Sequence, residues 1–385
     1  MDPRVAVVGV GSAGFARETP DVSYKELMFL AARAAYEDAG VNPRTDIDSF
    51  VACSEDFLEG TSIFDEYVPD QLGAVQRPVQ TVAGDGLFGV ATAVMLIESG
   101  IASVVAVEAH SKASNVVTLG AIEAFALDPV LSRPLGVSTL SIAGLEMNRF
   151  LETGGNTEEH CAMVAARNRE SALANPRAAY GSPVDGDETP LSWPLRKLDV
   201  AEPADGCVVV VLASEERARR LSGRPVIVLG CGWSSDTPTL ESRDWSRAEA
   251  VERAGGVAFS AAELAPGSVD VAEVDDTYSY KELQHLEALG FAPEGRAGAL
   301  LEGGVFDREP ADHPRPGPVV NPSGGALGQG SLFEANGLAR VLACVEQVRG
   351  DAGDRQVDGA RVALAQSWRG VPTTSAAVAL FGAAS

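Results

Sequence analysis

The chain has 385 residues, 45% of them hydrophobic and 22% charged, which is typical of a globular protein with one large domain or two of medium size. Its formal net charge of −24 excludes a nucleic-acid backbone and an anionic membrane surface as partners, because both are bound through a basic face. The five cysteines show no CxxC spacing and no apolar run reaches the ~18 residues of a membrane span, so we expect a cytoplasmic protein without a metal site.

Short β-branched runs alternate with Ala-rich amphipathic segments along much of the chain. Strands are predicted at 4–11, 48–56, 103–111, 206–214 and 224–235, and helices at 24–40, 89–99 and 158–176. This alternation favours an α/β fold. The stretch GVGSAG at 9–14 matches the dinucleotide pattern GxGxxG, but Pro20 interrupts the helix that should follow, so we interpret the stretch as a close-packed turn.

The sequence also contains an internal repeat. Residues 35–56 and 258–278 share an Ala-rich helix, a Pro-containing turn and a strand that ends in acids. Two copies of one βαβ-rich unit indicate a duplicated fold. We therefore predict an N-terminal half at 1–220 and a C-terminal half at 221–385, with an insertion at about 115–195 in the first half, where the alternation loosens.

The stretch QTVAGDGLFGVATAVMLIESG (80–100) passes from a strand through a Gly-Asp-Gly turn into an apolar helix. Such an elbow commonly presents a nucleophile, because the first helical turn has unpaired N–H groups and a positive dipole end. Between Gly84 and Gly89 there is no Ser, Cys or Thr. Asp85 is the only ionisable side chain of the elbow, and it is interpreted equally well as a base or as the cap of the helix.

The stretch VVNPSGGALGQGSLFEANGLARVLACVEQVRG (319–350) resembles the thiolase superfamily, in its sterol-carrier-protein-like and archaeal acetyl-CoA acetyltransferase branches. The elbow helix, EVDDTYSYKELQHLEALGF and LAQSWRGVPTTSAAVALFG agree with that family in order and spacing. The resemblance implies a thiolase fold, built from duplicated βαβαβαββ units in a five-layered αβαβα arrangement. It also implies a coenzyme A thioester as substrate, no tightly bound cofactor, a homodimer, and often a small zinc-ribbon/OB-fold partner.

Against that family the reactive groups are missing. The resemblance places Gly86 where members carry the cysteine that forms an acyl-enzyme, and Ser331 where they carry the histidine of G-H-P. The last loop, which usually holds another cysteine or an H-N pair, reads QSWRG. The tyrosines of the family's steroid side-chain aldolases would fall at Asp275 and Ser331, so that subgroup is not matched either. What remains are backbone N–H groups near Gly86, Leu87 and Gly370 that can hold an enolate oxygen.

The candidate site residues fall into two groups. Candidates for catalysis are Asp85, Gly86, His110, Asp275, Tyr280 and Ser331. Candidates for substrate binding are Asn321, Ser323, Gly324, Gly325, Trp368, Arg369 and Gly370. Asp275 is interpreted equally well as the cap of the next helix, and a lone buried histidine such as His110 is more often structural. Tyr278 is expected to pack, and Cys53 to be a buried thiol.

Three functional hypotheses follow. The leading one is an acyl-CoA enzyme that makes or breaks a C–C bond by an aldol or Claisen-type step, without an acyl-cysteine and with a zinc-ribbon/OB-fold partner. The second is a non-catalytic subunit of an acyltransferase complex, and the third is an acetyl-CoA C-acetyltransferase with a relocated nucleophile. A polar pocket at Gly86, Asp275 and Ser331 favours catalysis, and side chains that fill this space favour the second hypothesis.

Overall fold

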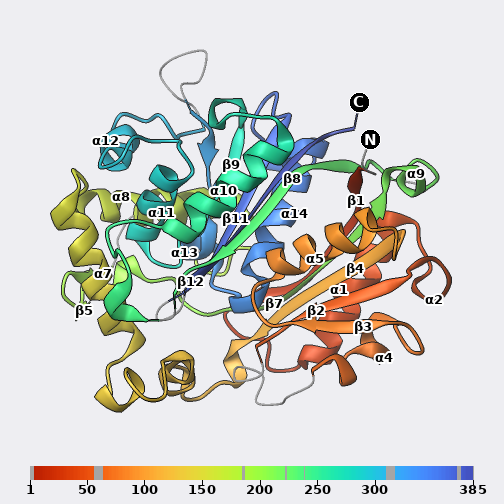
Figure 1. The fold of residues 1–385 in the computed structure, drawn as a ribbon, viewed down its shortest axis with the longest axis horizontal. Coiled ribbons are helices and arrows are strands. Elements are labelled where there is room, and N and C mark those ends of the chain that lie inside the picture. The colour runs from red at the N-terminus through yellow and green to blue at the C-terminus, as the bar shows by residue number, and fades with distance from the viewer. Residues whose placement is uncertain are drawn as a thin grey trace.

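A computed structural model describes residues 4–55, 64–183, 187–221, 223–237, 239–308, 317–370 and 374–384. In this part of the chain ten strands form one mixed sheet, in the order β10-β9-β11-β12-β8-β1-β7-β4-β2-β3 (Figure 1). The first five strands are β1 (Val5–Ala16), β2 (Ser49–Cys53), β3 (Val79–Val82), β4 (Val104–Lys112) and β7 (Asp205–Ser214). The other five are β8 (Val226–Ser235), β9 (Val271–Glu273), β10 (Val319–Val320), β11 (Val362–Gly370) and β12 (Thr374–Ala383).

Each set of five strands has the same order and the same directions. In both sets, β3-β2-β4-β7-β1 and β10-β9-β11-β12-β8, the first three strands are parallel and the next two pairings are antiparallel. The two sets join where three residues of β1 pair with β8. The boundary between residues 220 and 221 stays a prediction, and Asp56, the last residue of the first repeat, lies outside the described residues.

One aspartate in each repeat shows why the two stretches look alike in sequence. The Asp48 carboxylate accepts hydrogen bonds from the N–H groups of Ser103 and Val104, at 2.7 and 3.0 Å. Asp270 accepts from the corresponding N–H groups at the start of β11, at 2.8 and 2.9 Å. Each aspartate therefore fixes the start of the neighbouring parallel strand. The stretches Cys53-Ser54-Glu55 and Asp275-Asp276-Thr277, near the ends of the two repeats, lie at equivalent strand ends.

The helices form the remaining layers. Helix α1 (Tyr24–Ala39) packs on the outer face of the first strand set, and α10 (Glu249–Ala262) on that of the second. Helices α5 (Gly86–Glu98) and α14 (Asn336–Arg349) lie between the two sets in one shared apolar core (Figure 1). These layers give the αβαβα arrangement.

The remaining helices are short or belong to the insertion. They are α2 (Pro43–Asp46), α4 (Pro69–Leu72), α6 (Leu119–Glu123), α7 (Thr139–Thr153), α8 (Glu158–Ser171), α9 (Glu215–Ala218), α11 (Ser279–Ala288), α12 (Ala297–Glu302) and α13 (Gly325–Gln329). Helices α7 and α8, with the short strands β5 (Pro190–Ser192) and β6 (Leu195–Arg196), pack on the C-terminal half beside α11, α12 and α13 (Figure 1). No helix within the described ranges combines the length and the apolar character that a bilayer span requires.

The glycines of the GVGSAG stretch serve helix packing. A Cβ atom at Gly9 or Gly11 would lie closer than 3.0 Å to the backbone of α1, and one at Gly230 or Gly232 closer than 3.0 Å to that of α10. The expected turn is wrong, because residues 9–14 continue β1 as a strand. The glycines let each outer helix approach its sheet closely, which is a use of glycine that needs no bound nucleotide.

Candidate functional site

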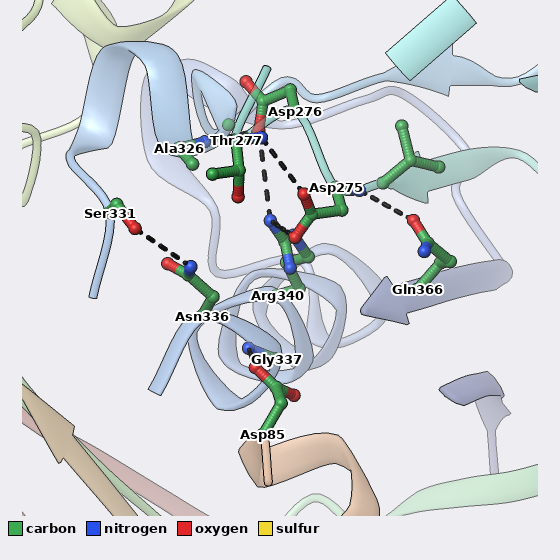
Figure 2. A network of polar contacts seen from close by, with 12 residues as sticks. Asp85, Asp275, Asp276, Thr277, Ala326, Ser331, Asn336, Gly337, Arg340 and Gln366 are labelled. Carbon is green, nitrogen blue, oxygen red and sulfur yellow. Dashed lines mark hydrogen bonds and ion pairs between the residues drawn. The ribbon is translucent and has the colours of Figure 1, made fainter. Parts of the chain in front are cut away.

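The elbow between β3 and α5 is held by Asp85. One carboxylate oxygen accepts the Leu87 N–H at 2.8 Å, and the other accepts the Gly337 N–H at the start of α14, also at 2.8 Å (Figure 2). Asp85 thus caps both central helices at once, and burial raises the pKa of its carboxyl group. Because the Leu87 N–H is bonded to Asp85, it is not free to hold a substrate oxygen.

The space in front of Gly86 is filled. A Cβ atom built on Gly86 would lie closer than 3.0 Å to the Leu338 side chain and 3.2 Å from the Ala109 Cβ atom. Leu338 belongs to the first turn of α14 and is fully buried. A cysteine at this position would therefore overlap Leu338 unless α14 shifted.

Asp275 is buried and paired with a cation. Its carboxylate lies 2.7 Å from the Arg340 guanidinium, and its N–H donates to the Gln366 side chain at 2.7 Å (Figure 2). Asp276 accepts the Ala326 N–H at 2.6 Å and so caps α13, and burial raises its pKa to about 7. Arg340 of α14 lies 2.7 Å from the Asp275 carboxylate and 3.9 Å from that of Asp276, so it pairs with Asp275 inside the protein.

The polar groups of the Asn-Pro-Ser-Gly-Gly loop are hydrogen-bonded to residues at the end of β9. Asn321 accepts the Val274 N–H at 2.8 Å, and the Ser323 hydroxyl donates to Glu273 at 2.6 Å. A Cβ atom at Gly324 or Gly325 would lie closer than 3.0 Å to Ala172 or Asp276, respectively, and both glycines have positive φ. From the sequence we expected these glycines to allow approach of a ligand, and in the structure they allow approach of Ala172, just after the end of α8, and of the Asp276 carboxylate.

His110 and Tyr280 lie apart from the elbow. His110 is hydrogen-bonded to Glu108 at 3.0 Å and stacks between Tyr24 and Phe64, on the face of the sheet opposite to Ala109. Tyr280 donates to the Glu146 carboxylate at 2.9 Å within the C-terminal core. The structure does not bring either side chain to Gly86 or Ser331.

A cavity of about 290 Å³ remains beside Ser331. Its wall comes from strand ends, the insertion and the start of α14, and consists of Glu55, Glu123, Ala126, Thr277, Tyr278, Ser331, Phe333, Asn336, Trp368, Arg369 and Gly370. Four of the predicted residues meet here: Ser331, Trp368, Arg369 and Gly370. The cavity therefore unites the last loop with the Gly-rich loop, while Gly86 and Asp275 are outside its wall. Residues 371–373 of the last loop lie outside the described residues.

Several side chains of this wall are held by direct contacts. Asn336 donates to the Ser331 hydroxyl at 3.3 Å (Figure 2), and its own side-chain oxygen accepts the Leu332 N–H at 2.8 Å. Arg369 forms two hydrogen bonds with Glu55, at 2.9 and 2.5 Å. The wall therefore presents an oriented amide and hydroxyl, together with a carboxylate that is already neutralised.

Glu123, Asn336 and Tyr278 were not among the predicted site residues. Tyr278 was expected to pack, and it packs against Trp368 edge to face while it lines the cavity. The sequence did point to Glu55, because it lies just before the end of the first repeat, at the position equivalent to Thr277 in the second. No sequence feature pointed to Glu123, because it belongs to the insertion. The local pattern does not reveal where the insertion packs on the C-terminal half.

None of the five cysteines is activated. Cys53, Cys161, Cys207 and Cys344 are buried and Cys231 is partly buried, and all five are free thiols. Burial raises the pKa of each, to about 12 for Cys231, so no thiolate is present at neutral pH. Within the described residues no group of three or more His, Cys, Asp or Glu side chains is arranged to hold a metal ion.

A duplicated five-layered fold, with two central helices that begin at one site, defines a thiolase-type protein. A family model described as "Thiolase C-terminal domain-like" matches residues 232–383. The acetyl-CoA acetyltransferase of Methanothermobacter thermautotrophicus is 33% identical, over 97% of this chain and 98% of its own. The chain therefore belongs to the thiolase superfamily.

Two further comparisons agree with this assignment. Sterol carrier protein 2 of Oryctolagus cuniculus is 30% identical over 94% of this chain and 69% of its own length. Among solved structures, that of the Ltp2-ChsH2(DUF35) aldolase superposes with a TM-score of 0.82, covering 99% of this chain and 98% of that one at 24% identity. The predicted family and fold are confirmed.

Proposed function

We propose that this protein is an acyl-CoA enzyme that makes or breaks a carbon–carbon bond through an enolate, without an acyl-cysteine. The observation that carries the proposal is the contrast between two neighbouring places. Leu338 fills the space in front of Gly86, whereas a cavity with several polar side chains in its wall persists beside Ser331. A ping-pong acyl transfer needs a covalent carrier, but an aldol-type step needs only a base and hydrogen-bond donors for the thioester oxygen. The structural similarity to the Ltp2-ChsH2(DUF35) aldolase supports the same reaction class.

The cavity supplies candidates for each role. Glu123 and Tyr278 line one wall, and burial together with the Glu123 charge raises the pKa of the Tyr278 hydroxyl. In the cleavage direction we assign Glu123 as the base that receives the β-hydroxyl proton through Tyr278. The Cα–Cβ bond then breaks, a carbonyl product leaves, and the thioester enolate takes up at Cα the proton that Glu123 received, which restores the base. Ser331 and the oriented amide of Asn336 donate to the enolate oxygen.

The test is turnover of β-hydroxyacyl-CoA thioesters by paired variants. Tyr278→Phe and Glu123→Gln are expected to lower kcat by about 10²–10⁴, the usual contribution of a general acid or base. Tyr280→Phe is the matched control, because that tyrosine is buried outside the cavity wall and should keep the wild-type kcat. Equal rates for Tyr278→Phe and the wild type, or a loss confined to Tyr280→Phe, would contradict these assignments.

We also propose that this cytoplasmic enzyme works as a homodimer with a zinc-ribbon/OB-fold partner. The net charge of −24 favours a partner with a basic face, and the structurally similar aldolase is named for two proteins, Ltp2 and ChsH2(DUF35). An enolate must also be kept from water, which a partner over the cavity achieves. Turnover measured with and without a co-purified zinc protein tests the partner, and light scattering at micromolar concentration tests the dimer. Full activity of the chain alone would exclude the partner requirement.

A second candidate, a non-catalytic subunit, is favoured by one observation. Leu338 fills the space in front of Gly86, and Arg340 pairs with the Asp275 carboxylate. These are the two places where the chemistry of the family takes place. This candidate predicts no turnover of any CoA thioester, either by the chain or by its complex, and a partner that is active by itself. The third hypothesis, a relocated cysteine, has the least support because the five thiols have raised pKa values.

A further inference from the structure

Phe333 stands between two cavities. It lines the cavity beside Ser331 and also a second cavity, of about 330 Å³, at the end of β4. Of the described residues, Phe333 alone belongs to both walls. Next to it, the Glu55 N–H in the first wall donates to Glu334 in the second wall at 3.3 Å. The two cavities therefore meet at the half-buried Phe333, with this polar contact beside it.

The backbone of Phe333 is strained, which marks this position as unusual. Its φ of +48° lies in the left-handed region, where a bulky residue is an outlier. The surrounding turn enforces this conformation: Leu332 is fully buried, the Ala335 N–H donates to the Leu332 carbonyl at 2.9 Å, and Asn336 accepts the Leu332 N–H at 2.8 Å. The turn therefore fixes where the ring of Phe333 lies.

The second cavity combines polar side chains, Ser111, Lys112, Asn115 and Glu334, with one apolar side that suits an alkyl chain. Its wall includes the apolar side chains of Val116, Val117, Leu119 and Ile122, from the insertion. The Lys112 ammonium group in the same wall is already bonded to Asp205 at 2.7 Å, so it is not an unpaired charge that would exclude an apolar group. The first cavity is likewise lined by polar and apolar side chains, and it lies at the lower end of the size range of ligand pockets, which is about 300–1,000 Å³.

We propose that Phe333 determines acyl specificity by closing the apolar side of the second cavity to the substrate, so that the wild-type protein takes short acyl thioesters. This inference rests on the proposed function, because it assumes that the acyl group occupies the cavity beside Ser331. Removal of the ring would roughly double the space available to the acyl group and expose apolar walls to it. Each methylene buried there would then favour binding of a longer chain.

The experiment compares the affinities of acetyl-, hexanoyl- and decanoyl-CoA, measured by isothermal titration calorimetry, for the wild type and three variants. Phe333→Ala removes the ring, Phe333→Gly removes the ring and also the backbone strain, and Phe333→Leu is the control that retains most of the bulk. In both ring-deleted variants we expect decanoyl-CoA to bind at least about tenfold more tightly than in the wild type, with acetyl-CoA little changed. Phe333→Leu should resemble the wild type.

The outcomes separate this proposal from the proposed function. If the wild type binds acyl-CoA but the two ring-deleted variants keep its chain-length preference, the role of Phe333 is refuted and the proposed function stands. If neither the wild type nor any variant binds a thioester, the proposed function is refuted and the role of Phe333 with it. Phe333→Gly guards against misfolding, because glycine adopts a φ of +48° without strain.

Discussion

Leu338 is expected to be the obstacle to restoring a cysteine at the elbow. In Gly86→Cys the new side chain overlaps the Leu338 side chain, and overpacking of this kind destabilises a protein by about 1–3 kcal/mol. Leu338→Ala alone removes a fully buried side chain and is expected to lower the free energy of unfolding by about 2–5 kcal/mol. In the double variant the thiol enters the space that leucine vacates. The loss should therefore be smaller than the sum of the two single losses, by about 1–3 kcal/mol.

Urea denaturation of the four proteins, followed by circular dichroism, measures this coupling. The control pair is Gly86→Cys with Leu342→Ala, since Leu342 is a buried leucine one turn further along α14 that is not among the nearest neighbours of a Cβ atom at Gly86. That pair should be additive within about 0.5 kcal/mol. Additive losses for Gly86→Cys with Leu338→Ala would refute the conclusion that Leu338 occupies the place of the nucleophile.

Three further predictions concern the same site. The wild type incubated with acetyl-CoA should show no covalent adduct by intact-mass spectrometry, because the elbow has no cysteine and all five thiols have raised pKa values; a stoichiometric acetyl group on Cys53 or Cys207 would revive a relocated nucleophile. Arg340→Met should lower the free energy of unfolding by about 3–5 kcal/mol, because it leaves the buried carboxylate of Asp275 unpaired. Adding Asp275→Asn should recover part of this loss, and an equal or greater loss in the double variant would contradict the pairing. Burial raises the pKa of Glu273 to about 7, so the folded state holds a proton that the unfolded state releases near pH 4, and the free energy of unfolding should fall as the pH rises from about 4 to 7. In Glu273→Gln this fall, measured by urea denaturation at pH 5 and 8, should be smaller by about 2–3 kcal/mol. An unchanged fall would show that Glu273 is not its source.

A duplicated α/β fold could be predicted from the local patterns, and its five-layered arrangement from the resemblance to the thiolase superfamily. These local patterns were readable because they repeat: both halves contain an Ala-rich helix, a Pro-containing turn and a strand that ends in acids, whereas the packing role of Gly9 and Gly11 was not predicted. The absence of Cys and His at the reactive positions was also readable, since it depends only on which residue stands at Gly86 and Ser331. Each of these two residues can be read from a single position, once the order of the helices and strands is known from the resemblance.

The side chains that surround Gly86 and Ser331 come from elements far apart in the chain, so they could be identified only in the folded structure. Asp85 and Gly337 are 252 residues apart in the sequence, yet their hydrogen bond makes Asp85 a cap of two helices. Asp275 sits in the densest polar stretch, but Arg340 of α14 neutralises it. Glu123 reaches the cavity because the insertion folds back onto the other half. Such contacts depend on which elements pack together, and a pattern read along one segment contains no information about the side chains of another.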